Sequence, residues 1–146
     1  RVPIDFAQQS LAAVLAPYVD DTRAVAIIEG VLLYLDRDQL SATARAVRAL
    51  APAVTVLCDE MSPAFFARAG HATHDRLQQF GAPFQIQGVN VPGVWRSAGF
   101  REVQRTSIPV RMAELGRGPF PRWLLKTFLR SFAAGYVVAE WESVRT

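Results

Sequence analysis

Acidic side chains follow three short apolar segments of this chain, in positions where they could meet a ligand. Asp5 follows residues 2–4, Glu29 follows the run at 24–28, and Asp59 and Glu60 follow the run at 54–58. Short apolar runs of this kind predict strands. In open α/β sheets, ligands bind outside the carboxyl ends of the strands. Acids at such ends suit a ligand with several hydrogen-bond donors and a positive charge.

Glu29 is the most informative of these acids, because its neighbours on both sides are apolar apart from Gly30. The run is too apolar for a solvent-facing strand and too short to span a membrane. We expect a buried strand that delivers Glu29 to its end, where a carboxylate without a partner costs several kcal/mol. For the other acids a structural role stays open, with Asp5 as a helix cap and Asp59 and Glu60 as loop residues.

The composition indicates one globular domain spanning residues 1–146. With 51% hydrophobic residues the chain can bury a substantial core. No apolar stretch reaches the length of a membrane span, and no secretory leader pattern is present, so we expect a cytoplasmic protein without a membrane partner. The chain starts at Arg1 and runs directly into Val-Pro-Ile-Asp-Phe, which leads us to expect a fragment or a processed chain.

Basic side chains cluster late in a chain whose formal net charge is +3. Between residues 111 and 130, Glu114 stands alone against Arg111, Arg117, Arg122, Lys126 and Arg130. This bias could attract an anionic partner, but no nucleic-acid-binding motif accompanies it, so a solvated helix face is favoured. The apolar helix expected at 123–132 could cover a pocket or lie on a membrane surface, and packing against its own sheet is the favoured interpretation.

The first half of the chain alternates between helix and strand. Asp36 and Gln39 form a plausible capping box for a helix that Pro52 ends. The order strand, helix, strand with short joints indicates neighbouring parallel strands. Helices are expected at 7–16 and 63–80, and strands at 24–28 and 54–60.

The second half lacks this crossover rhythm, so its last two strands are expected to pair antiparallel. A short helix around 95–98 should end at Gly99, which is a typical residue after a helix C-terminus. Around it we expect a loop at 81–93, a strand at 100–110, an irregular linker at 111–121 and a final strand at 136–141.

Residues 29–35, Glu-Gly-Val-Leu-Leu-Tyr-Leu, preceded by Val-Pro-Ile-Asp-Phe at 2–6, resemble the S-adenosylmethionine-dependent O-methyltransferases of the leucine carboxyl methyltransferase type, which include polyketide-tailoring enzymes. The resemblance extends to residues 95–100 and 135–140, which look like the segment before the sixth strand and the closing strand of class I methyltransferases. It implies an α/β fold, the C-terminal half of a Rossmann-like class I methyltransferase sheet, with parallel strands, an antiparallel last strand and helices on both faces.

The resemblance also implies S-adenosylmethionine as cofactor and a small-molecule acceptor. Asp5 and the backbone at Phe6 would contact the adenine, and Glu29 with Gly30 would lie at the amino-acid and sulfonium end. Tyr34 would project toward the acceptor as the catalytic residue, where a phenol can orient an acceptor oxygen. Judged from the residues alone, Tyr34 could also be a core aromatic with a satisfied hydroxyl.

The chain departs from this family in lacking the glycine-rich cofactor loop. Its Gly-x-Gly at 116–118 follows no apolar strand and reads as a linker turn. The resemblance therefore covers the end of the third strand through the seventh. In the family the first and second strands lie between the third and the fourth. The strand at 24–28 corresponds to the fourth strand, so without the first and second strands it has an open apolar edge. Because open edges invite pairing, we expect the missing N-terminal half or a second copy of the chain as partner.

The chemistry of the acceptor stays open between a carboxylate and a hydroxyl. A hydroxyl needs a base, for which His71 and His74 are candidates. With Asp75 these histidines lack a further ligand at metal-binding spacing, so no metal site is expected. The alternative function is a non-catalytic interaction module, an orphan half-domain that has lost cofactor binding.

Overall fold

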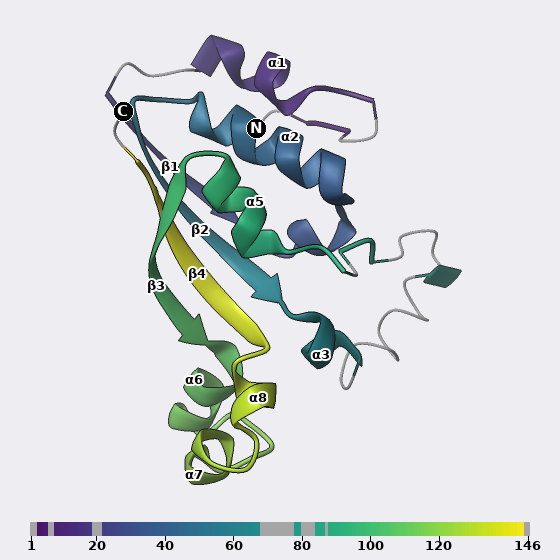
Figure 1. Cartoon of the computed structure of the whole chain (residues 1–146), viewed down its shortest axis with the longest axis vertical. Helices are drawn as coiled ribbons and strands as arrows, with labels where there is room; N and C mark the ends of the chain where they lie inside the picture. Colours follow the sequence, from purple (N-terminus) through teal and green to yellow (C-terminus); the bar gives the residue numbers. More distant parts are fainter. Residues whose placement is uncertain are drawn as a thin grey trace.

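The computed structural model describes residues 3–5, 8–18, 22–67, 78–79, 84–86 and 88–144. Within them lies a four-stranded sheet in the order β1-β2-β4-β3 (Figure 1). The strands β1 and β2 are parallel, and β4 runs antiparallel to both β2 and β3. This confirms the α/β fold with parallel strands and an antiparallel last strand. The strands are β1 Arg23–Ile28, β2 Ala53–Met61, β3 Phe100–Ser107 and β4 Tyr136–Ser143.

The helices form a layer on one face of the sheet and a separate lobe at its end (Figure 1). The layer comprises α1 Leu11–Leu15 with the 3-10 turn η1 Ala16–Tyr18, the turn η2 Leu32–Tyr34, α2 Arg37–Arg48 and α5 Val91–Ser97. The short helix α3 Pro63–Phe65 follows β2. The lobe between β3 and β4 comprises α6 Ile108–Glu114, α7 Arg122–Lys126 and α8 Arg130–Ala133.

The predicted capping box begins α2 as expected. One oxygen of Asp36 accepts hydrogen bonds from the backbone N–H groups of Asp38 and Gln39, each at 2.8 Å. The Gln39 side chain accepts in return from the Asp36 N–H at 3.0 Å. These bonds satisfy N–H groups that have no partner within the helix. Gly99, at φ 85° after the end of α5, is confirmed in the role expected of it.

Several predicted boundaries were wrong, and α5 begins at Val91, inside the loop predicted at 81–93. The first helix begins at Leu11, so it is shorter than the predicted 7–16. The strand at 100–110 ends at Ser107, whose hydroxyl accepts from the Val110 N–H at 3.3 Å and starts helix α6, where a linker was predicted. The helix predicted at 123–132 is split into α7 and α8, because Thr127 has φ −113° and ψ −93°. Most of the predicted 63–80 helix and part of the 81–93 loop lie outside the described residues.

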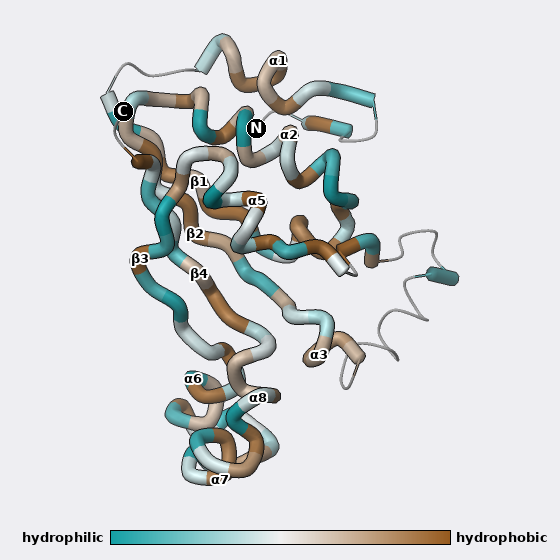
Figure 2. Tube along the Cα trace, viewed as in Figure 1, coloured by the Kyte–Doolittle hydropathy of each residue, from teal (hydrophilic) through white to brown (hydrophobic). Residues whose placement is uncertain are grey.

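The main core lies between the sheet and the layer of α2 and α5. Figure 2 shows apolar stretches along the central strands. The largest side chains at the centre, Trp95 and Trp141, are fully buried, and their rings stack at 6.4 Å between centroids. Leu40 and Val56 are also fully buried. Because these large side chains are fully buried, their packing fixes the positions of the strands that carry the acids.

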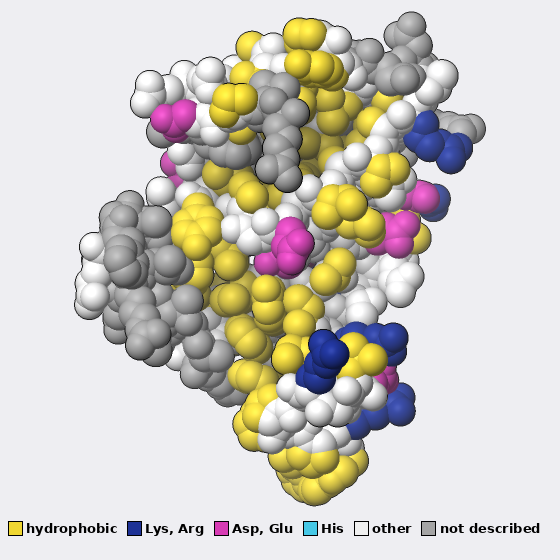
Figure 3. Space-filling view, turned by 180° about the vertical axis from the view of Figure 1, so that it is seen from behind, with side chains coloured by type: hydrophobic (Ala, Val, Ile, Leu, Met, Phe, Trp, Pro, Cys, Tyr) yellow, Lys and Arg dark blue, Asp and Glu magenta, His cyan; other side chains and the backbone are white. Residues whose placement is uncertain are grey.

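The other face of the sheet is largely uncovered by the described residues, so the helices expected on both faces cover only one of them in this part of the chain (Figure 1). Ala24, Ala26 and Ile28 of β1 pack against the core, whereas Val25 and Ile27, on the opposite face, are 63% and 72% exposed. Viewed from behind, hydrophobic side chains are exposed across the middle of the molecule (Figure 3). The prediction of a buried strand at 24–28 was therefore wrong for one face, because β1 is an edge strand covered on one side only.

No helix among the described residues is both long enough and apolar enough to cross a membrane.

Candidate functional site

The carboxyl end of β1 turns sharply at Glu29 and Gly30. Gly30 has φ 65°, a left-handed conformation that glycine adopts at little cost. Its N–H donates to Oδ1 of Asp59 at 2.8 Å, which anchors the turn to the neighbouring strand. Glu29 lies just past the last residue of β1 that pairs with β2, and it is exposed. The prediction of a buried site for Glu29 was wrong, because the edge strand leaves this end open.

Asp59 joins the ends of three strands. It is buried near the end of β2, and its second oxygen, Oδ2, accepts from the Tyr136 hydroxyl of β4 at 3.3 Å. Burial, together with the negative charge of Asp59, raises the pKa of Tyr136, so the phenol stays protonated as the donor. The alternative that Asp59 is a loop residue is excluded, because β2 extends to Met61.

Replacing Asp59 with alanine is expected to destabilise the fold by about 1–3 kcal/mol, because Gly30 N–H and the Tyr136 hydroxyl lose their acceptor. Hydrogen exchange at the Gly30 amide should accelerate in parallel. Asp59→Asn is the matched control, since its amide oxygen can still accept from Gly30 while its nitrogen cannot accept from Tyr136. Unchanged Gly30 exchange in the alanine variant would show that this bond does not hold the turn.

Glu60 points to the opposite face of the sheet from Asp59, as expected for neighbouring residues in a strand. It is buried, and Oε1 accepts from the Trp141 indole N–H at 3.0 Å. The Arg105 guanidinium lies 3.0 Å from Oε2 as an ion pair. Burial raises the pKa of Glu60, while the positive charge of Arg105 opposes that shift. Glu60 also lies within β2, so the alternative that it is a loop residue is excluded as well.

Arg105 is shared between two carboxylates. Its Nε and Nη2 donate to Glu102 at 2.8 and 3.0 Å, a two-point contact that lowers the pKa of Glu102. It reaches Glu60 from β3 across the intervening strand β4. Arg105, Tyr136 and Trp141 are site residues that sequence reasoning missed. Nothing in their local sequence indicates that they meet the acids of β2, since that depends on the strand order.

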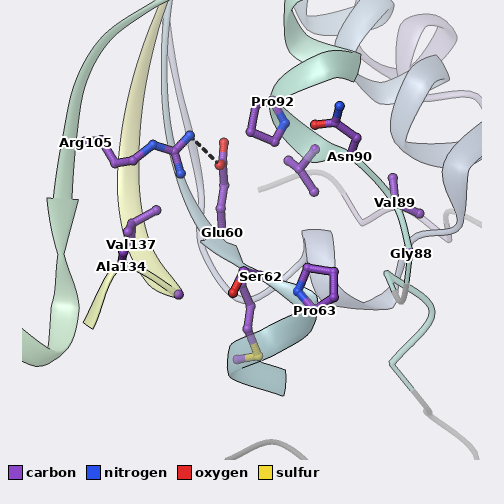
Figure 4. Close-up of a pocket in the computed structure, with 13 residues that line it drawn as sticks. Glu60, Ser62, Pro63, Gly88, Val89, Asn90, Pro92, Arg105, Ala134 and Val137 are labelled. Atoms are coloured by element: carbon purple, nitrogen blue, oxygen red, sulfur yellow. Dashed lines mark ion pairs between the residues drawn. The ribbon is translucent and has the colours of Figure 1, made fainter. Parts of the chain in front are cut away.

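A cavity of about 320 Å³ opens beside Glu60, between the end of β2, the start of β4 and the segment that leads into α5 (Figure 4). Its wall is mainly apolar, with Glu60, Arg105 and Asn90 as its larger polar members. The other lining residues are Met61, Ser62, Pro63, Gly88, Val89, Val91, Pro92, Ala134, Gly135 and Val137.

A second cavity of about 340 Å³ lies on the open face, beneath the turn at Glu29. Glu29, Asp59 and Tyr136 provide its polar groups, and Ile108 at the start of α6 borders it. The apolar part of its wall comes from Ile27, Ile28, Leu57 and Val138, with Cys58 completing it. The acids predicted from the sequence are therefore divided, with Glu29 and Asp59 at one cavity and Glu60 at the other.

The remaining predicted residues lie apart from these cavities. Tyr34 is half-buried in η2, where its ring packs on Phe84 at 5.3 Å between centroids, and it lines neither cavity. Asp5 is exposed in a turn, and its carboxylate accepts from the Gln8 side chain at 2.9 Å. It does not cap α1, which has Ser10 at that position. Phe6 lies outside the described residues.

The histidines considered as base or metal ligands, His71 and His74, also lie outside the described residues. Among the residues that are described, no group of three or more His, Cys, Asp or Glu side chains could hold a metal ion. Cys58 is buried next to Glu60, and burial raises the pKa of its thiol. It is therefore a poor nucleophile in this position.

Comparison with solved structures assigns the fold. No protein-family model and no curated protein matches the chain. The structure of a DUF574 family protein from Streptomyces avermitilis matches with a TM-score of 0.58 and 10% identity, over 97% of this chain and 53% of that chain. The chain shares the fold of that protein. At this level of identity the likeness concerns the fold alone.

Two methyltransferase structures match less well, each with a TM-score of 0.46 over 84% of this chain. One is geranyl diphosphate methyltransferase in complex with SAM, at 8% identity and 50% of that chain. The other is geranyl diphosphate C-methyltransferase from Streptomyces coelicolor in complex with Mg²⁺, geranyl diphosphate and S-adenosyl-L-homocysteine, at 9% identity and 46% of that chain. The chain spans about half the length of the solved structures that it matches.

Proposed function

We propose that this chain is the C-terminal half of a class I S-adenosylmethionine-dependent O-methyltransferase that acts on a carboxylate or hydroxyl of a small molecule. The observation that carries the proposal is the sheet itself. Its order β1-β2-β4-β3, with β4 antiparallel between its neighbours, matches the sheet that the resemblance implies. The Glu-Gly segment of the resembling motif lies at the carboxyl end of β1, where open α/β sheets bind ligands.

The residues at this end fit the charged part of the proposed cofactor. Glu29 is exposed and lines the open-face cavity, so its carboxylate is available to an ammonium or sulfonium group. Asp59, through Gly30, holds the turn that presents it. When bound, S-adenosylmethionine supplies a methyl group already activated on sulfur. The protein's task is then mainly alignment, which can contribute about 7–11 kcal/mol in favourable cases.

The other site roles rest on the resemblance. In the proposal, Asp5 and the backbone of Phe6 contact the adenine, and Tyr34 orients the acceptor oxygen. The ring of Tyr34 packs on Phe84 at 5.3 Å between centroids, and Tyr34 lines neither cavity.

The partner in this proposal is the missing N-terminal half, which would pair with the free edge of β1 and cover the open face. A second copy of the chain is the other candidate for the same surface. The alternative function, an interaction module that has lost cofactor binding, uses the same surface but needs no ligand at Glu29.

Binding of S-adenosylhomocysteine tests the proposal directly. We expect saturable binding by calorimetry when the chain is combined with its N-terminal half, and none by the chain alone. Glu29→Ala should weaken that binding about ten- to a hundredfold, the range for one hydrogen bond to a charged group. The control is Asp38→Ala, which removes an exposed acid that lies elsewhere, on α2, and should leave the binding of S-adenosylhomocysteine unchanged. Absence of binding in both samples would favour the interaction module.

A further inference from the structure

The lobe between β3 and β4, residues 108–135, carries the positive net charge of the chain. It contains five basic side chains and one acidic one, whereas the rest of the chain contains 11 basic and 12 acidic side chains. The acidic one, Glu114, is shared by Arg111 and Arg122, each at 3.1 Å. The other basic side chains of the lobe are exposed and form no ion pair with a described carboxylate, namely Arg117, Lys126 and Arg130. The lobe therefore has an excess of positive charge that attracts an anionic partner.

Large hydrophobic side chains are exposed on the same lobe. Trp123 is 63% exposed and Phe128 is 82% exposed. Figure 3 shows hydrophobic side chains covering the free end of the lobe, with Lys and Arg side chains beside them. Three further large hydrophobic residues of the lobe are exposed, namely Met112, Leu115 and Phe120. Single exposed hydrophobic residues are ordinary, but a group of them marks an interaction site.

Trp123 points away from the lobe because the opposite side of α7 is packed. Leu125 is buried, and α7 contacts both α6 and α8. With about 3.6 residues per turn, Trp123 lies about 200° round the helix from Leu125 and so faces outward. Lys126, three residues after Trp123, is its neighbour on the helix surface. An aromatic ring beside an ammonium group is typical of helices that lie between lipid headgroups and acyl chains.

We propose that the free end of this lobe docks on the surface of an anionic lipid bilayer. Trp123 and Phe128 enter the boundary between headgroups and acyl chains, and the basic side chains meet the headgroups. A bilayer fits this surface better than an acidic protein, because long basic side chains reach the headgroups while the rings beside them enter apolar surroundings.

A peripheral membrane contact replaces the expectation from the sequence, in which this segment packed against its own sheet and no membrane partner was expected. It is independent of the proposed function. The free end of the lobe lies away from β1, so the partner expected at that edge can bind at the same time (Figure 1).

Flotation with lipid vesicles tests this docking, because protein that has bound lipid floats whereas aggregates of the chain sink. The chain is mixed with vesicles of phosphatidylcholine alone, or of equal parts of phosphatidylcholine and phosphatidylserine. We expect about a hundredfold tighter binding to the mixed vesicles, from three basic side chains that contribute about fivefold each. Equal affinities would contradict the proposal. No flotation with either vesicle would overturn it and leave a protein as the occupant of this surface.

The indole emission of Trp123 reports on insertion. Trp95 and Trp141 are fully buried, so a blue shift on adding mixed vesicles comes from Trp123. Trp123→Ala should abolish the shift and weaken binding about tenfold. The matched control is Tyr18→Ala, which removes an aromatic side chain that is exposed to the same extent outside the lobe, and it should change neither. Binding without a blue shift, or an equal loss in Tyr18→Ala, would refute the insertion.

A second pair of variants tests the charge of the lobe. Lys126→Gln should weaken binding to the mixed vesicles about fivefold. Arg45→Gln, which removes an exposed positive charge on α2, should leave it unchanged. Equal losses in the two variants would show that binding follows the net charge of the chain, contrary to docking by the lobe. These measurements need no S-adenosylhomocysteine, so their failure is distinguishable from failure of the proposed function.

Discussion

Replacing Trp141 with alanine is expected to lower the free energy of unfolding by about 3–5 kcal/mol, the usual cost of removing a large buried aromatic. Trp141 is fully buried and stacks on Trp95 in the core between the sheet and α5. Its indole N–H also donates to Oε1 of Glu60 at 3.0 Å, so the variant leaves a cavity and removes a buried hydrogen bond to a carboxylate together. Since domains typically have a free energy of unfolding of about 5–15 kcal/mol, such a loss is a large fraction of the total stability.

Urea denaturation followed by circular dichroism measures this effect. Trp123→Ala is the matched control, because it removes the same side chain at a site that is 63% exposed, and it should change stability by no more than about 0.5 kcal/mol. Trp141→Phe should fall between the two, since it keeps most of the apolar volume and loses the N–H. Similar losses for Trp141→Ala and Trp123→Ala would contradict the assignment of the core.

The isolated chain is expected to associate through β1 and the open face of the sheet. Among the described residues β1 pairs with β2 alone, so the backbone groups on its other side are left without strand partners. Beside them Val25 and Ile27 expose apolar surface at 63% and 72%. A free edge next to an apolar face favours pairing with another chain. Light scattering should give a mass well above 16.1 kDa.

Charge placed on this surface should reverse the association. The double variant Val25→Lys with Ile27→Lys is expected to yield a monomer, because lysines on an edge strand oppose pairing. Phe128→Lys is the control, since Phe128 is 82% exposed in the lobe of α6 to α8 and away from β1. A monodisperse 16.1 kDa species for the unmodified chain would refute the expected partner, and monomers from Phe128→Lys alone would move the interface to the lobe.

Features set by neighbouring residues were predictable from the sequence. The capping box of Asp36 and Gln39 and the end of α5 at Gly99 depend on a few adjacent residues, and both were predicted correctly. The four strands were recognised because each is a short segment that contains β-branched or aromatic residues and is bounded by turn or helix signals. The start of α6 was missed, although Ser107 followed closely by Pro109 is a helix start signal, because the preceding strand pattern was continued past it.

The candidate site was predictable only in part. The sequence indicated that acids end three strands; residues 3–5 before and at Asp5 form no strand, whereas Glu29 and Asp59 follow strand positions and lie together at one cavity. The sequence could not indicate that Glu29 is exposed, because an apolar run has the same pattern whether one or both faces of its strand are covered. Nor could it identify Arg105 as the partner of Glu60, because these residues lie 45 positions apart on strands that are not adjacent.

By itself the sequence determined the four strands, the helix between the first two of them and the acids at the ends of β1 and β2, because these follow from periodicity and from contacts within a few residues. The tertiary structure alone decided what surrounds those acids. The insertion of β4 between β2 and β3 brings Tyr136 to Asp59, and Trp141 and Arg105 to Glu60. These contacts arise from strand pairing between distant segments, which no local pattern encodes.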